Sequence, residues 1–222
     1  MALSFPLAVD DFFGGLRVKS CTFHLPPAAM SSGVTGAGEI LTANRGQRLW
    51  QGTITLRKCS FNEGEAAMAL IDTLGESGRS FFVYNTMKPR PALAPIGSAM
   101  DIALQAATVT LKTIVSNNRE LELQGLPNGL AISPGDQLGF PYGENPTRYA
   151  LHRLARGGVA NGGGVAAVES SSFLRAGAEA GRPVQLIRPA CKAVIVPGSV
   201  QPGTAAGVFV EGISFNWRQT LR

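Results

Sequence analysis

The sequence predicts a mainly β fold with one packed helix, in which a β-sandwich-like domain carries an inserted small β-barrel. Three observations support this fold class. The 222 residues include 27 glycines and 14 prolines, which favour turns and leave little room for long helices. The apolar residues fall in short alternating runs, as they do in half-buried strands. Helical periodicity is confined to one stretch, at about residues 63–74.

The first part of the chain contains two expected strands separated by a loop. In Leu16–Leu25 the apolar alternation slips by one residue near Ser20, as a β-bulge would cause. Pro26–Glu39 has the composition of a loop throughout. Arg48–Cys59 then alternates cleanly, which predicts a strand with one solvated face and an apolar face made of Trp50, Ile54 and Leu56.

The expected helix covers about Glu63–Leu74. Asn62 is a suitable N-cap, and Glu65 three residues later completes a capping-box pattern. Gly75 provides the C-terminal stop. One apolar stripe, which would pack on a sheet, is formed by Ala67, Leu70, Ile71 and Leu74. Arg79–Asn85 then has the pattern of a strand buried on both faces.

The middle of the chain predicts a small barrel. Lys88–Ser98, with three prolines and a glycine, is interpreted as a linker. Beyond it, five or six short strands occur in about ninety residues, as in small barrels. Turn signals separate these strands at Asn117–Asn118 and at Ser133–Asp136. Gly157–Gly164 is expected to be a flexible tip, and Arg182–Pro189 a further short strand.

The residue pattern of the last strand resembles that of the first part of the chain more than that of the middle. After the turn-rich residues 196–207, apolar and polar residues alternate through Ile213–Arg222. We expect this strand to lie beside Arg48–Cys59, and a shared core to contain Trp50, Ile54, Leu56, Ile213, Phe215 and Trp217. The predicted domains are therefore residues 1–97 with 198–222, and an inserted barrel at 98–197. Insertion is tolerated where the two ends of the host domain lie close together.

Charge and cysteine content exclude several classes of protein. The formal net charge is +5, but lysine and arginine are scattered, so nucleic-acid binding is not expected as the main function. Cys21, Cys59 and Cys191 are too few and too far apart for a disulfide framework or a zinc site. Since the first fifteen residues lack the pattern of a signal peptide, and no stretch is apolar enough to span a membrane, we expect a soluble protein made in a cytoplasm.

No constellation of residues indicates catalysis. The two histidines, His24 and His152, fall in separate predicted domains and are assigned structural roles. Asp10 and Asp11 would point to opposite faces of a strand, and Cys191 lies between apparent strands, where a packing role is favoured. The glycine-rich stretches lack the spacing of phosphate-binding loops. We therefore predict no enzyme, and no catalytic, cofactor-binding or metal-binding residues.

Several segments together resemble a known family. They are "RLWQGTITL", the capped helix, "GRSFFVYN", the proline-rich segment, "GLP" followed by "PGD", and "LIRPACKAVIVPGSV". In this order they resemble tail-tip and baseplate proteins of siphophages and their prophages, and most of all the distal tail protein, which joins the tail tube to the tip. The resemblance implies a ring-forming β domain that carries an OB-like or galectin-like barrel at its periphery, and it implies no catalytic residues.

The resemblance also implies partners. The chain would form a homo-hexameric ring, contact the tail tube protein and the baseplate hub or other tail-tip proteins, and meet DNA only in transit through the lumen. It would be made in the host bacterial cytoplasm and reside in the virion. The sheet with Arg48–Cys59 and Ile213–Arg222 would then surround the lumen.

Two alternatives belong to other classes of protein. One is a carbohydrate-binding module that contacts a host-surface glycan, which requires exposed aromatic residues in the barrel, where the sequence offers Phe140, Tyr142, Tyr149 and Phe173. Trp50 and Trp217 could also stack on a sugar, although a shared core is the favoured interpretation. The other alternative is a tail-associated wall hydrolase, which requires a carboxylate pair or a metal cluster that the sequence does not display.

Overall fold

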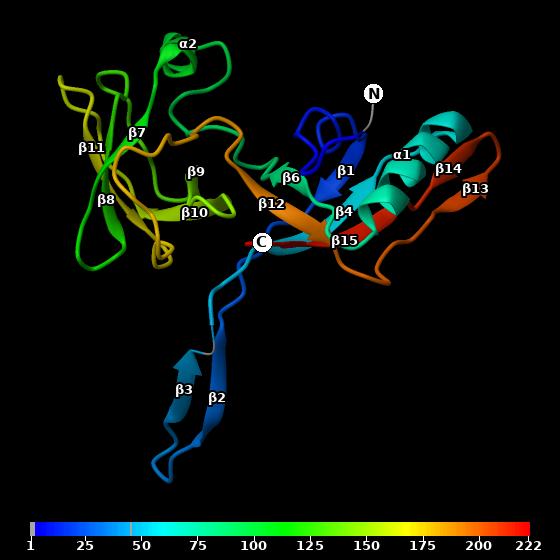
Figure 1. The fold of residues 1–222 in the computed structure, drawn as a ribbon, viewed down its shortest axis with the longest axis horizontal. Helices are drawn as coiled ribbons and strands as arrows, with labels where there is room; N and C mark the ends of the chain where they lie inside the picture. Colours follow the sequence, from blue (N-terminus) through cyan, green and yellow to red (C-terminus); the bar gives the residue numbers. More distant parts are fainter. Residues whose placement is uncertain (1–2, 45) are drawn as a thin grey trace. The chain divides into compact units, whose positions relative to one another are not determined.

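The computed structural model describes residues 3–44 and 46–222. Strands make up 37% of the chain and helices 10%, so the prediction of a mainly β fold is confirmed. The prediction of a single helix is wrong, because two are present among these residues (Figure 1). The chain divides into two compact units. The barrel unit comprises the residues up to Gly15, Ser80–Ala193 and Leu221–Arg222, and the hairpin unit comprises Leu16–Arg79 and Val194–Thr220.

The barrel unit contains a curled five-stranded antiparallel sheet of order β7-β8-β11-β10-β9. The strands are β7 (Thr110–Ile114), β8 (Glu120–Gln124), β9 (Gln137–Tyr142), β10 (Arg148–Arg156) and β11 (Ala166–Ser170). The long strand β10 pairs with β9 over Arg148–Arg153 and with β11 at Leu154 and Arg156, on either side of a register shift. The sheet curls around a core that includes Leu111, Leu121, Leu123, Leu138, Phe140 and Leu154.

A short extended segment links the two edge strands of this sheet. Leu111 N donates to Arg182 O and Val184 N to Val109 O, at 2.9 and 2.8 Å, which ties the segment to β7. Gln185 and Gly139 exchange both of their backbone hydrogen bonds, which ties it to β9. The expected strand at Arg182–Pro189 is therefore present only as isolated bridges, and these bridges give the sheet its barrel-like character.

The proline-rich segment Lys88–Ser98 is not a free linker. Two buried carboxylates of the barrel unit hold it. Asp136 accepts hydrogen bonds from Lys88 Nζ at 3.2 Å and Ala92 N at 3.0 Å, and Asp101 accepts one from Gly97 N at 3.0 Å. Ala94 is fully buried in the barrel core.

The second helix, α2 (Ala99–Ala106), begins directly after this segment. Ser98 is its N-cap and accepts a hydrogen bond from Asp101 N at 3.1 Å, a capping pattern that the sequence analysis did not use. Burial raises the pKa of Asp101, but the hydrogen bond from Gly97 N and the bonds from Arg90 and Gln105 outweigh it, so the pKa lies below its usual value.

Lys88→Ala is expected to lower the free energy of unfolding by about 1–2 kcal/mol, because it removes the cation that faces the fully buried Asp136. Hydrogen exchange of residues 88–98 should accelerate at the same time. The matched control is Lys112→Ala, since Lys112 pairs with the partly exposed Glu122 at 3.1 Å and should cost no more than about 0.5 kcal/mol. Equal losses in the two variants would contradict the anchoring role of Asp136.

The expected tip at Gly157–Gly164 is present only as an exposed turn at 161–163, and the backbone before the turn is anchored. Ile132 N donates to Gly158 O at 2.8 Å, and Ala160 is buried. A Cβ atom at Gly157 would overlap the carbonyl oxygen of Ile132, and one at Gly158 would overlap that of Ala167. These two glycines therefore allow the backbone to approach its neighbours closely instead of making the segment flexible.

Two further strands, β6 (Phe81–Tyr84) and β12 (Ala190–Ile195), pair antiparallel, with Phe81 opposite Ala193 and Tyr84 opposite Ala190. The amino-terminal residues join this pair through a parallel bridge between Leu7 and Phe81.

In the hairpin unit, the strand that directly follows Trp50 lies beside the strand that contains Trp217. Its central strands are β1 (Val18–Cys21), β4 (Gln51–Leu56) and β15 (Ser214–Gln219), in the order β1-β4-β15. Ile54 lies opposite Phe215, and Gly52 lies opposite Trp217. The register of β1 against β4 shifts between Val18 and Ser20, where the sequence predicts a bulge.

The first helix, α1 (Phe61–Leu74), begins two residues earlier than expected. Its N-cap is Ser60, whose backbone N–H and hydroxyl both bind the Glu63 carboxylate at 3.0 Å, so the assignment of Asn62 as the cap is wrong. Both residues fit the same motif, because each has a glutamate three positions later. The helix contacts β5 (Cys59–Ser60) and β14 (Phe209–Glu211), which form a small sheet with β13 (Thr204–Ala206).

The expected loop at Pro26–Glu39 is largely a β-hairpin. Its strands are β2 (Ala29–Val34) and β3 (Ile40–Asn44), and every residue of both strands is exposed. The hairpin extends away from β1 and β4 (Figure 1). At its base, Arg48 Nη2 donates to Leu25 O at 2.8 Å, and Arg48 Nε donates to Pro26 O at 3.2 Å.

Candidate functional site

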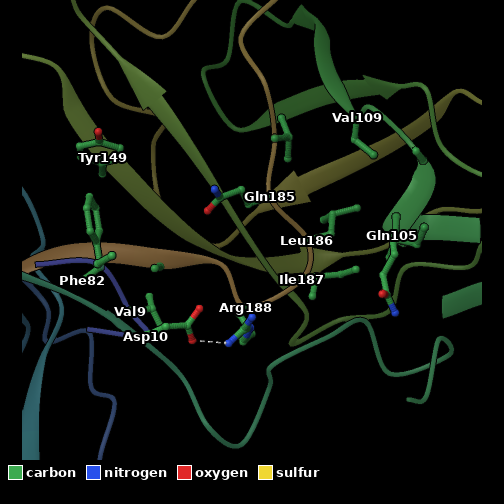
Figure 2. Close-up of a pocket in the computed structure, with 15 residues that line it drawn as sticks. Val9, Asp10, Phe82, Gln105, Val109, Tyr149, Gln185, Leu186, Ile187 and Arg188 are labelled. Carbon is green, nitrogen blue, oxygen red and sulfur yellow. Dashed lines mark hydrogen bonds and ion pairs between the residues drawn. The ribbon is translucent and has the colours of Figure 1, made fainter. Parts of the chain in front are cut away.

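The barrel unit contains a pocket of about 670 Å³, within the usual range for ligand-binding pockets (Figure 2). Its walls come from the amino-terminal segment, β6, α2, β10 and the segment after the barrel strands. Apolar and polar groups both line it, and the apolar residues of the lining include Leu104, Val109, Val184, Leu186 and Ile187.

Polar groups occur at a few places around this pocket. Arg188 donates to the Asp10 carboxylate at 3.0 Å, and the two side chains are 48% and 77% exposed. The backbone of Arg188 has φ of 45°, and its N–H donates to Pro89 O at 2.6 Å. Tyr149 meets Phe82 edge to face, with ring centroids 4.7 Å apart. Because the one cation of the lining is paired with the one carboxylate, the pocket suits a group without net charge.

All six residues predicted to form a shared core lie inside the hairpin unit. They are buried at 0–4% exposure, namely Trp50, Ile54, Leu56, Ile213, Phe215 and Trp217. Phe23 joins them, with its ring centroid 4.5 Å from that of Trp217 and 6.0 Å from that of Trp50.

The candidate catalytic residues are dispersed. His24 is exposed, whereas His152 is 1% exposed and stacks on Phe140 in the barrel core. All three cysteines are buried and none is in a disulfide, and burial raises the pKa of Cys21 to about 12. Among residues 3–44 and 46–222, no three side chains of the metal-ligating types gather closely enough to hold an ion. Neither helix in this part of the chain is long and apolar enough to cross a membrane.

The four barrel aromatics differ in accessibility. Phe140 and Tyr142 are 2% exposed, so two of the residues expected to be available to a glycan are buried. Tyr149 is half-buried in the pocket. Phe173 is 60% exposed and lies beneath the Arg119 guanidinium, whose central carbon is 4.3 Å from the ring centroid.

The β2–β3 hairpin is a second candidate surface, which the sequence analysis missed. Its register places Met30 opposite Ala43, and Leu41 follows on the same face, so one face is apolar. Val34 pairs with Ile40 next to the connecting turn. Met30, Val34, Ile40 and Leu41 are 49–67% exposed. The apolar residues of an alternating strand were visible in the sequence, but the neighbouring glycines and serines concealed the pattern.

No protein-family model and no curated protein matches this chain in sequence. The chain is described by its fold and surfaces: it is a mainly β protein with a pocket on a barrel-like unit and an exposed apolar hairpin on the other unit.

Proposed function

We propose that the chain is a structural protein of a phage tail tip. It is a distal tail protein that forms a ring, hexameric in the family that it resembles, and the ring connects the tail tube to the baseplate hub and the host-recognition parts. Its partners are other copies of itself, the tail tube protein and the hub. Its role rests on assembly, and it is not an enzyme.

The observation that carries the proposal is the β2–β3 hairpin. An isolated two-stranded hairpin is marginally stable in water. This one also exposes four large apolar side chains, and Glu39 is the one charged residue in the range 29–44. An exposed strand pair of this composition invites pairing with another chain. In a protein whose role is to assemble, another chain would cover such a surface.

The inserted arrangement is part of the proposal. The barrel strands lie in the chain between residues 16–79 and 194–220, which together make up the hairpin unit. This order supports a ring-forming domain at 1–97 and 198–222 that carries the barrel at 98–197. The glycan-binding alternative has less support, because Phe140 and Tyr142 are buried.

The test is the mass of the purified full-length chain by light scattering and native mass spectrometry, with electron microscopy of the particles. We expect a closed oligomer. The double variant Met30→Ser/Leu41→Ser should raise the dissociation constant about 100-fold, since each side chain contributes about 1.5 kcal/mol when buried. Val159→Ser, at another exposed apolar site, is the matched control. A wild-type chain that stays monomeric at all concentrations and is absent from virions would overturn the proposal.

A further inference from the structure

Two surfaces of this chain have matching chemistry. One is the Tyr149 pocket, as we name the cavity with Tyr149 and Phe82 at one end and Asp10 and Arg188 at its rim. The other is the hairpin end, which we define as Val34 and Ile40 with the turn between them. Val34 is 64% and Ile40 67% exposed, so each presents most of its apolar surface to solvent.

We propose that the hairpin end of one copy inserts into the Tyr149 pocket of the next copy. The inference deepens the proposed function, on which it rests, by naming the two surfaces that make the ring contact. Each copy donates one hairpin and accepts one, so the contact is heterologous and generates a ring when the rotation closes.

Charge supports a hairpin as the occupant. An unpaired charge is costly against the apolar part of the pocket lining, and within the strands β2 and β3 no residue is charged. The one charged residue, Glu39, lies next to Ile40 in the turn, where insertion would bring it to the rim. Arg188 lies at that rim with its side chain 48% exposed. A second carboxylate beside the guanidinium that already holds Asp10 leaves one negative charge in excess, which water can solvate because the Arg188 and Asp10 side chains are 48% and 77% exposed.

The shape of the hairpin supports the same occupant. The turn is closed by its own hydrogen bonds, from Thr35 N to Glu39 O and from Gly38 N to Thr35 O, both at 2.9 Å. Arg48 fixes the other end of the hairpin. A segment ordered before binding loses less conformational entropy on association than a flexible peptide does.

The experiment uses two complementary full-length variants. The first, Val34→Asp/Ile40→Asp, places charge on the hairpin end, with Asn44→Asp at the hairpin base as its control. The second, Gln185→Trp, fills the pocket from an exposed position whose side chain points into it (Figure 2), with the exposed Gln201→Trp as its control. Ala8→Trp, another exposed lining position, replaces the second variant if Gln185→Trp does not fold by circular dichroism.

We expect each variant alone to be monomeric, with at least a 100-fold rise in the dissociation constant, and both controls to assemble as the wild type does. An equimolar mixture should form a heterodimer of about twice 23.3 kDa and nothing larger, because one intact hairpin meets one intact pocket. A mixture that stays monomeric while the wild type assembles would overturn the docking and leave the proposed function standing. Dimers of the pocket variant alone would show hairpin-to-hairpin pairing and also overturn it. A monomeric wild type would overturn both.

Discussion

Replacing Trp217 by alanine is expected to lower the free energy of unfolding by about 3–5 kcal/mol, which is a large part of the stability of a typical domain. The indole is fully buried on β15, and its ring lies 4.5 Å from that of Phe23. The backbone around it is fixed by pairing on β4, where Gly52 is its opposite residue. Because that pairing prevents the strands from closing over the space, the substitution leaves a cavity.

Urea unfolding followed by circular dichroism measures this loss. Trp217→Phe should cost less, about 1–2 kcal/mol, since it keeps an aromatic ring and removes an indole N–H that is buried without a hydrogen-bond partner among the described residues. Arg218→Ala, on the exposed face of the same strand, should change the free energy by no more than about 0.5 kcal/mol. If Trp217→Ala cost no more than Arg218→Ala, the ring would not be part of a packed core.

The core of the hairpin unit could be predicted from the sequence because strand alternation has a period of two. Trp50, Ile54 and Leu56 are separated by even numbers of residues, as are Ile213, Phe215 and Trp217, so each set shares a face. The sequence also predicted where α1 lies, but it did not predict the residue at which the helix begins. Ser60 and Asn62 both satisfy the capping motif, and the choice between them depends on the strand β5 that ends at Ser60.

Features that depend on distant residues were not predictable. The segment 88–98 has the composition of a linker, and its attachment requires Asp136, which is 44 residues beyond Ala92 and 48 beyond Lys88 in the chain. The pocket likewise collects residues from five separate segments of the sequence. No local pattern encodes such an arrangement. The hairpin was missed for a different reason, since its strands have few β-branched residues and its stability does not come from packing on its own unit.

The barrel unit is expected to lose stability as the pH falls below about 6.5, because of His152. Burial and, second, the positive charge of Arg175 lower the pKa of this histidine from 6.5 to about 3. Its Nδ1 lies 3.2 Å from both Ser170 Oγ and Ser172 Oγ, and its Nε2 is buried without a hydrogen-bond partner among the described residues. The folded chain therefore has no ready place for a second ring proton.

The sign of the effect follows from which state binds the proton first. Between pH 6.5 and 3 the unfolded chain protonates this histidine and the folded chain does not, so unfolding takes up a proton and acid favours it. The slope approaches about 1.4 kcal/mol per pH unit, which gives a loss of about 2 kcal/mol between pH 7 and 5 and an upper limit of about 4–5 kcal/mol at pH 3. Protonation of the Asp101 carboxylate, whose pKa is lowered in the fold, adds a loss that begins only near pH 4 and below.

Urea unfolding at pH 7, 6 and 5 separates His152 from other groups. His152→Asn cannot titrate in this range, so its free energy of unfolding should be lower at pH 7 but nearly constant down to pH 5. His24→Asn, at the exposed histidine, is the matched control and should keep the wild-type slope. A wild-type slope that persisted in His152→Asn would assign the acid sensitivity to other residues. Loss of the slope would instead show that a buried neutral histidine makes the barrel unit sensitive to mild acid.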